Sequence, residues 1–287
     1  GRILTAFEEA ERETSPARQE SLLTFAIVGA GPTGVELAGT IADLAHDTLP
    51  HDFRAIDTRK TKVLLVEAGP KVLSGYPDDL SQYAKAALEN LGVEVSLGAP
   101  VTRIERNAIT FGDRRVEAHT IIWAAGVRAS RAAEWLGVPA DRNGRVIVEP
   151  DLSVPAHANI FVVGDTAAVK APDGSPVPGI APAAKQEGAF VAKTIRRRLS
   201  GASEGPSFHY HHDGSLAQIG KRKAVIDFGR VKLRGTIAWW LWGIAHIYFL
   251  VGVRSRLTVA LNWLWIYMRN QRGARLITEA VRESAVD

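Results

Sequence analysis

The chain has 287 residues, of which 46% are hydrophobic and 23% charged, as is usual for a globular protein of one or two domains. Its net charge of +4 is too small to indicate a nucleic-acid partner. The absence of cysteine excludes disulfides, thiolate metal sites and a redox-active cysteine pair. Any electron transfer must therefore occur without a thiol, and we expect no metal site.

Residues 3–14 form the first predicted element, a helix that Ser15-Pro16 ends. Its apolar side chains Ile3, Leu4 and Phe7 need a surface to pack against.

A glycine-rich turn lies within residues 22–40, LLTFAIVGAGPTGVELAGT. The residues before the turn predict a strand, and those after it predict a helix. Gly29 permits the turn, Gly31 lets the backbone approach a pyrophosphate, and Gly34 lets the helix pack on the strand. The free N–H groups of the helix N-terminus would then face the phosphates. The pattern predicts a dinucleotide site that includes Pro32 and Thr33; the alternative is a glycine turn in an unrelated α/β domain.

Glu67 ends the apolar run 62–67, which predicts a parallel strand buried on both faces. A carboxylate there accepts hydrogen bonds from the adenosine ribose and repels a 2′-phosphate, which favours NADH over NADPH. Glu67 lies further from Gly34 than the usual ~20 residues, and we attribute the excess to the polar segment 46–61. The alternative is a surface glutamate.

The next predicted elements complete a doubly wound α/β domain. They are a helix over 79–90, a strand from 93, a β-meander over 101–117 and a strand over 120–124. Small residues at Ala125 and Gly126 would let a cofactor lie across the strand ends.

The sequence allows two roles for each of the acidic residues Glu36 and Asp165. Glu36, in the first turn of the glycine-turn helix, is either a carboxylate stabilised by the helix dipole or a proton relay near a nicotinamide. Asp165 follows Gly164 after a predicted strand over 160–163, and it either binds a ribityl hydroxyl or belongs to an ordinary turn.

The remaining predicted elements are a strand over 144–148, a helix from Ala183 to about Leu199, a linker over 200–207, and strands over 215–219 and 224–228.

The C-terminal segment 237–268 is rich in tryptophan and is bordered by basic residues. The tryptophans are Trp239, Trp240, Trp242, Trp263 and Trp265, and the basic residues are Lys232, Arg234, Arg254, Arg256, Arg269, Arg272 and Arg275. A helix over 237–253 is only ~25 Å long against ~30 Å of hydrocarbon. We expect a helix pair lying in one leaflet; the alternatives are a buried dimer or core helix and a true span. His246 is expected to be a packed or interfacial histidine, not a ligand.

The order of these motifs along the chain is specific. The sequence contains, in this order, GAGPTGVELAG, LLVEAGP, WAAGV, IFVVGD and APAAKQEG, and then the Trp-rich basic tail. The chain resembles the C-terminal two thirds of a type II NADH:quinone oxidoreductase, a single-subunit, non-proton-pumping flavoprotein of the respiratory chain. The resemblance implies the fold of flavoproteins with two dinucleotide-binding domains. It divides the chain into a helical linker (1–21), an NADH domain (22–130), part of an FAD domain (131–212) and C-terminal strands with membrane-anchoring helices (213–287).

The resemblance also implies roles for individual residues. NADH would be held by the glycine turn, Glu67, Ala125 and Gly126, and FAD by Gly164 and Asp165. Ala181, Pro182 and Ala183 would border the flavin ring, Lys185 and Gln186 would contact the quinone, and Glu36 would act near both. Hydride would pass from NADH to FAD, and two electrons would then pass to membrane quinone.

The resemblance further implies a peripheral protein on the cytoplasmic face of the bacterial inner membrane, bound to the bilayer surface, with a homodimer as a candidate assembly.

Two departures from the family pattern matter. Many members have Ala-Gln where this chain has Ala181-Pro182, so a quinone contact is expected to be lost or replaced. The family's N-terminal FAD-binding glycine motif has no counterpart, so we expect a fragment in which the helix over 3–14 lacks its packing partner. This leaves two alternatives: a catalytically incomplete, membrane-associated NADH-binding module, and a flavin reductase with a protein acceptor.

Overall fold

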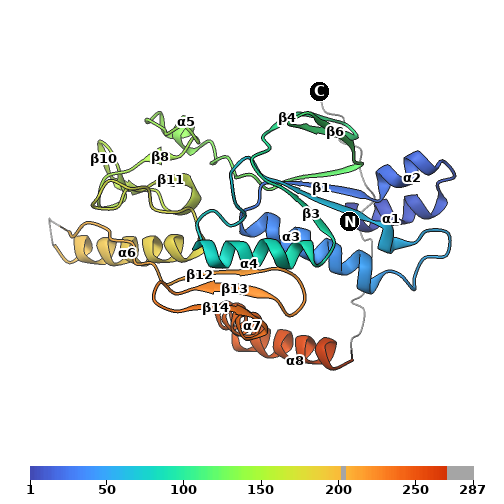
Figure 1. Ribbon diagram of the computed structural model, residues 1–287. Helices are drawn as coiled ribbons and strands as arrows, with labels where there is room; N and C mark the ends of the chain where they lie inside the picture. The colour runs from blue at the N-terminus through green and yellow to red at the C-terminus, as the bar shows by residue number, and fades with distance from the viewer. Residues whose placement is uncertain (202–204, 270–287) are drawn as a thin grey trace. The chain divides into compact units, whose positions relative to one another are not determined.

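The computed structural model describes residues 1–201 and 205–269. The chain forms two compact units (Figure 1). The first comprises Gly1–Gly126 and the chain from Gly214 onward, and the second comprises Val127–Asp213.

A four-stranded parallel sheet forms the centre of the first unit. Its strands are β1 (Thr24–Val28), β2 (Lys62–Val66), β3 (Val93–Ser96) and β7 (Thr120–Trp123), in the order β3-β2-β1-β7. All of β1 is buried, because both faces of the sheet are covered. This all-parallel arrangement is the predicted one, and it brings the carboxyl ends of the strands to one edge.

Alternate residues of β1 pack against different layers. Phe25 and Ile27 belong to the same core cluster as residues of α3 (Pro32–Asp43) and α4 (Asp78–Glu89). Ala26 and Val28 instead pack with the meander of β4 (Val101–Glu105), β5 (Ala108–Phe111) and β6 (Arg114–Glu117). Helices therefore lie on one face of the sheet and an antiparallel meander on the other (Figure 1).

The N-terminal segment has a packing partner, contrary to our expectation. In α1 (Arg2–Arg12), Phe7 is fully buried, with its ring centroid 5.3 Å from that of Phe25 and 6.0 Å from that of Phe53. The sheet itself therefore supplies the missing surface. A second helix that we did not predict, α2 (Pro16–Leu22), follows because Pro16 occupies a first-turn position, where its lack of an N–H costs nothing.

The long connection between α3 and β2 contains short helical turns. A π-helical turn (Leu44–Thr48) extends α3, and a 3-10 turn (Thr58–Lys60) precedes β2. Between them, the Glu11 carboxylate accepts hydrogen bonds from the backbone N–H groups of Arg54, Ala55 and Ile56 at 2.9–3.1 Å. The polar segment that we treated as an insertion is thus attached to α1.

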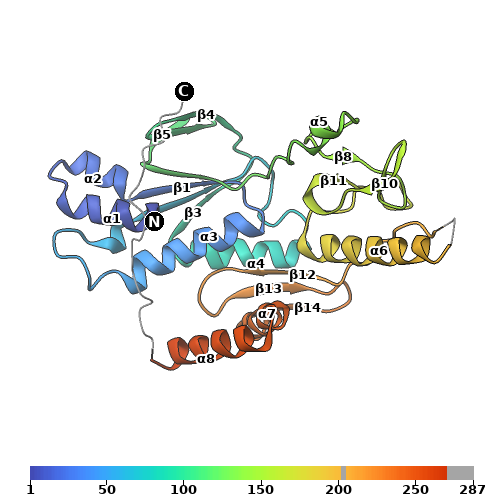
Figure 2. The ribbon, with the colours of Figure 1, turned by 180° about the vertical axis from the view of Figure 1, so that it is seen from behind.

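A second sheet completes the first unit. It is antiparallel, in the order β12 (Ser215–Gln218), β13 (Ala224–Asp227), β14 (Lys232–Gly235), and β14 was not predicted. A Cβ atom on Gly39 of α3 would lie 2.7 Å from the carbonyl oxygen of Ile219, so glycine is required for this close approach. Helices α7 (Thr236–Phe249) and α8 (Val253–Arg269) follow, with α7 against the sheet (Figure 2).

The second unit is built from short elements around its own core. They are α5 (Ala132–Leu136), β8 (Val146–Ile147), β9 (Ser153–Val154), β10 (His157–Phe161), a 3-10 turn (Gly164–Thr166), β11 (Ala167–Ala168) and α6 (Ala181–Leu199). The strand predicted over 160–163 instead spans 157–161, because it pairs with β9. Helix α6 begins two residues before the predicted Ala183.

Candidate dinucleotide and flavin sites

The three glycines of the turn after β1 have different structural requirements. Gly29 has φ +99°, and a Cβ atom there would lie 2.7 Å from the backbone of Ala125. A Cβ atom on Gly34 would lie 1.8 Å from the carbonyl oxygen of Gly29. A Cβ atom on Gly31 would meet nothing within 4 Å. Packing therefore requires Gly29 and Gly34, whereas Gly31 leaves open space in front of the helix.

The N-terminus of α3 opens onto this space. Its N-cap residue is Gly31, no side chain caps it, and Pro32 occupies a first-turn position. Pro32 and Thr33 are exposed. A helix N-terminus without a side-chain cap has N–H groups available to an anion such as a phosphate.

Glu67 is joined directly to the glycine turn. One carboxylate oxygen accepts the N–H of Ala30 at 2.6 Å, and the other accepts the N–H of Gly69 at 2.8 Å. Each oxygen thus accepts one N–H, and lone pairs remain for further donors such as ribose hydroxyls. The N–H of Leu73 donates to the carbonyl of Ala30 at 2.8 Å, so the loop after β2 holds both polar groups of Ala30.

The end of β7 completes this edge of the sheet. Ala125 and Gly126 are exposed, and Gly126 has φ +109°. The contact of Gly29 with Ala125 brings the two predicted cofactor segments together.

Glu36 contacts the second sheet of its unit. Its side chain is half-buried, and one oxygen accepts the backbone N–H of Gln218 in β12 at 3.1 Å. Tyr76, in the loop after β2, is 6% exposed and its hydroxyl hydrogen-bonds with Ser215. Burial and the nearby Glu36 charge raise the pKa of Tyr76 well above its usual range. Sequence reasoning missed Tyr76, because only the tertiary fold places it near Glu36.

In the second unit, the Gly164-Asp165 turn lies against α6. Gly164 has φ +68°, and its N–H donates to the Glu187 carboxyl group at 2.5 Å. Asp165 is exposed, and a Cβ atom on Gly179 would lie 3.3 Å from an Asp165 oxygen. Glu187 was not predicted as a site residue, because its relation to Gly164 is visible only once α6 is packed on the turn.

The N-terminus of α6 also has no side-chain cap. Its N-cap is Ile180, and Ala181, Pro182 and Ala183 form its first turn. The structure thus places all three predicted residues at the start of a helix in the unit that contains Gly164 and Asp165.

The two predicted quinone contacts have different surroundings. Lys185 is exposed. Gln186 uses both ends of its amide on the backbone of His211: its oxygen accepts the N–H at 2.9 Å and its nitrogen donates to the carbonyl at 2.7 Å. The Gln186 nitrogen also donates to Asp213 at 3.2 Å. The Gln186 side chain therefore holds the segment that follows α6, and its contact with quinone stays a prediction.

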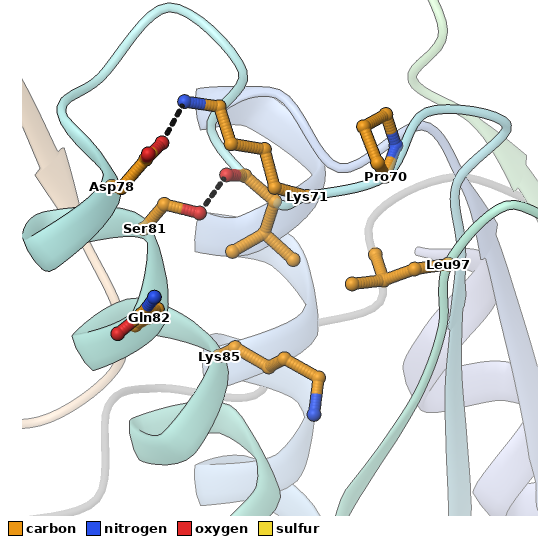
Figure 3. A pocket seen from close by; sticks show the side chains of 8 residues that line it. Pro70, Lys71, Asp78, Ser81, Gln82, Lys85 and Leu97 are labelled. Atoms are coloured by element: carbon orange, nitrogen blue, oxygen red, sulfur yellow. Dashed lines mark hydrogen bonds and ion pairs between the residues drawn. The ribbon is translucent and has the colours of Figure 1, made fainter.

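A shallow cavity of about 270 Å³ lies between α4 and the loop that follows β2. Figure 3 shows its lining, which is Pro70, Lys71, Val72, Asp78, Ser81, Gln82, Lys85 and Leu97. The Lys71 ammonium pairs with Asp78 at 2.7 Å, and the Ser81 hydroxyl donates to the carbonyl of Val72 at 2.7 Å (Figure 3). Because these polar groups already pair with one another, we assign the cavity no ligand.

Helices α7 and α8 expose a large apolar surface. Its members include Ile237, Trp240, Leu241, Ile244, Tyr248, Phe249, Val251, Val253, Leu257, Leu261, Trp263, Leu264 and Trp265. The rings of Trp242 and Trp263 stack 6.0 Å apart, which joins the two helices. Neither helix, within the described residues, has the length and hydrophobicity needed to cross a bilayer. Arg272 and Arg275 lie outside the described residues.

In the part of the chain that the structure describes, no three His, Asp or Glu side chains gather in a way that could hold a metal ion.

Comparison with known proteins places this geometry in a family. Residues 1–188 match the family described as pyridine nucleotide-disulphide oxidoreductase, and residues 212–270 match the NDH2 C-terminal domain. The chain belongs to the pyridine nucleotide-disulphide oxidoreductases. Its relatives include type II NADH:quinone oxidoreductases, which confirms the resemblance.

Two relatives come from Mycobacterium tuberculosis (strain ATCC 25618 / H37Rv). The type II NADH:quinone oxidoreductase Ndh is 46% identical over 290 residues, covering 97% of this chain and 62% of the relative. The relative NdhA is 42% identical over 292 residues, covering 97% of this chain and 61% of the relative. The chain thus spans about three fifths of the length of these type II oxidoreductases.

A solved structure supports the fold assignment. NDH2 from Plasmodium falciparum, in complex with NADH, superposes with a TM-score of 0.85 at 17% identity, covering 96% of this chain and 72% of that one. The predicted α/β fold of the type II oxidoreductases is therefore confirmed. The family binds FAD and NADH.

Proposed function

We propose that this polypeptide supplies the NADH-binding and membrane-contacting parts, and a portion of the FAD site, of an NADH:quinone oxidoreductase. In this proposal the enzyme passes hydride from NADH to FAD and two electrons to membrane quinone, without pumping protons. In this proposal, residues 22–130 bind NADH and residues 131–212 form part of the FAD-binding domain. Residues 213–287 contact the membrane, and residues 1–21 link to the rest of the FAD domain.

The observation that carries the proposal is the contact between Glu67 and the glycine turn. The hydrogen bond from Ala30 to Glu67 fixes a carboxylate beside the uncapped N-terminus of α3. A dinucleotide presents a pyrophosphate and a ribose diol, and this pair of groups suits both. Gly31, Pro32 and Thr33 would face the pyrophosphate, and Ala125 and Gly126 would border the nicotinamide half.

The second unit offers groups that fit FAD. The exposed Asp165 carboxylate can accept a ribityl hydroxyl, and the N-terminus of α6 can face a phosphate. FAD, when bound, supplies the two-electron chemistry between NADH and quinone. The protein's part is to orient that group and exclude water, and Gly164, Ala181, Pro182 and Ala183 would border it.

Glu36 is the proposed catalytic residue. Its contact with Gln218 occupies one carboxylate oxygen and holds the side chain at the start of α3. The other oxygen could hold a proton for quinone reduction. Lys185 and Gln186 are the proposed quinone contacts.

The apolar surface of α7 and α8 supports a lipid partner. Tryptophan and tyrosine favour the headgroup level of a bilayer, and arginine attracts anionic lipid. We place the protein at the cytoplasmic face of the inner membrane, with a homodimer as the candidate assembly. Attachment to a membrane favours quinone as the acceptor over a soluble protein.

Titration of the purified chain with NADH and with NADPH tests the proposal. We expect NADH to bind at least tenfold more tightly, because Glu67 repels a 2′-phosphate. Equal affinities, or binding of neither dinucleotide, would overturn the assignment of this site.

A further inference from the structure

Glu187 is a buried carboxyl group that the proposed reaction does not use. It lies in α6, is 3% exposed, and one of its oxygens is 2.5 Å from the backbone nitrogen of Gly164. Burying a carboxyl group is unfavourable unless a hydrogen bond compensates for the lost hydration. The Gly164 N–H supplies that compensation.

The contact fixes the peptide immediately before Asp165. Gly164 has φ +68°. Glycine adopts positive φ readily but also adopts other conformations, so an outside contact is needed to fix this one. A Cβ atom on Gly164 would lie 3.4 Å from the Cβ of Ala184, so α6 packs closely on this turn. Gly179 approaches the Asp165 carboxylate from the following loop. The turn is therefore held by α6 on one side and confined by this loop on the other.

The charge state of Glu187 depends on the same neighbours. Burial raises its pKa, the Gly164 N–H acts in the opposite direction, and the negative charge of Asp165 raises the pKa again. Among the described residues, Asp165 is the charged side chain that acts on Glu187. Ionisation of Glu187 adds a second negative charge beside Asp165.

We propose that Glu187 is a positioning residue for FAD, which holds Gly164 so that the Asp165 carboxylate is presented to a hydroxyl-bearing part of the cofactor. This inference rests on the proposed FAD site. Glu187 fixes the conformation of the Gly164-Asp165 turn, and Asp165 makes the contact with the cofactor.

Three variants of the full chain test the inference. Glu187→Ala removes the acceptor of the Gly164 N–H, whereas Glu187→Gln keeps an amide oxygen that can accept it. Thr194→Ala is the matched control, because Thr194 is 4% exposed in the same helix and lies further along it, after Glu187. FAD affinity is measured by quenching of flavin fluorescence, and thermal unfolding is followed without FAD.

We expect Glu187→Ala to weaken FAD binding about tenfold, as for one lost hydrogen bond, with Glu187→Gln within about threefold of wild type. Thr194→Ala should lower the melting temperature and leave FAD affinity unchanged.

Either of two results would overturn the inference alone: wild-type FAD affinity in a folded Glu187→Ala chain, or a loss of FAD affinity of about tenfold or more in Glu187→Gln, which keeps the acceptor. If Glu187→Ala does not fold, the comparison of Glu187→Gln with wild type still decides. A wild-type chain that binds no FAD would overturn the proposed FAD site together with this inference.

Discussion

Glu67 combines two tasks in one carboxylate. It accepts two backbone N–H groups that shape the loop after β2, and in the proposed function it also accepts the ribose diol. Replacing it with glutamine would alter both, because the amide nitrogen cannot accept a hydrogen bond.

For Glu67→Gln we therefore predict a preference for NADH over NADPH that is reduced about tenfold, because the charge that repels the 2′-phosphate is lost. The melting temperature should also fall, since an amide N–H would face the N–H of Ala30 or Gly69. Parallel titrations with the two dinucleotides measure the preference. An unchanged ratio of affinities would refute the ribose role.

Gly34 and Gly31 offer a matched pair at the same turn. Gly34→Ala places a Cβ atom against the Gly29 carbonyl, so we predict destabilisation of at least 2 kcal/mol, roughly the cost of overpacking. Gly31→Ala meets no protein atom, so the fold should be retained while NADH binding weakens. Urea unfolding and NADH titration separate the two effects. An equal loss of stability in both variants would contradict the conclusion that Gly34 is needed for packing and Gly31 for NADH binding.

Among the elements, α1 and the connection between α3 and β2 depend on Glu11. Burial raises the pKa of Glu11, but its three backbone hydrogen bonds and the charge of Arg54 outweigh burial and lower the pKa below its ordinary 4.5. Because the folded pKa is the lower one, Glu11 stabilises the fold above pH 4.5, and this stabilisation is lost as the pH falls through the folded pKa.

We accordingly predict that Glu11→Gln lowers the free energy of unfolding at neutral pH. The difference in this free energy between the variant and wild type should become smaller as the solution is acidified below pH 4.5. Urea unfolding at several pH values measures this narrowing. Glu8→Gln, an exposed change on the same helix, is the control. A constant difference across the acid range would show that the charge of Glu11 is not responsible.

Elements with a strong local pattern could be predicted from the sequence. The glycine turn, the apolar run of β2 and the meander are encoded by neighbouring residues, and the structure has all three. Helix α2 and strand β14 were missed because each is short and lacks a distinct apolar period.

The packing of α1 was predicted wrongly for a different reason. Its partner Phe25 is distant in sequence, and no local signal reports such a contact. Glu187 and Tyr76 were missed for the same reason, because only the tertiary fold places them beside Gly164 and Glu36.

At the scale of the whole molecule, the exposed surface of α7 and α8 bears on where the protein works. Ile244 of α7 and Leu261 of α8 are 60% and 65% exposed, and many other large apolar side chains of these two helices are exposed too. In the proposed function this surface lies in the headgroup region of a bilayer.

We predict that Ile244→Glu and Leu261→Glu each reduce binding to anionic phospholipid vesicles about tenfold or more, because a carboxylate in the interface is costly. Val127→Glu is the control, since Val127 is 78% exposed but belongs to the other unit. Vesicle flotation provides the measurement. An equal loss of binding in the control would mean that added negative charge alone is responsible.

The central claim is that this chain takes part in electron transfer from NADH through a flavin. Its most direct test is the visible absorbance spectrum of the detergent-purified chain, recorded with added FAD before and after NADH. We predict bound flavin absorbance that NADH bleaches, because we assign the NADH site and part of the FAD site to this polypeptide. A colourless protein that still binds NADH would contradict the claim for this chain and leave it a nucleotide-binding part of a larger enzyme.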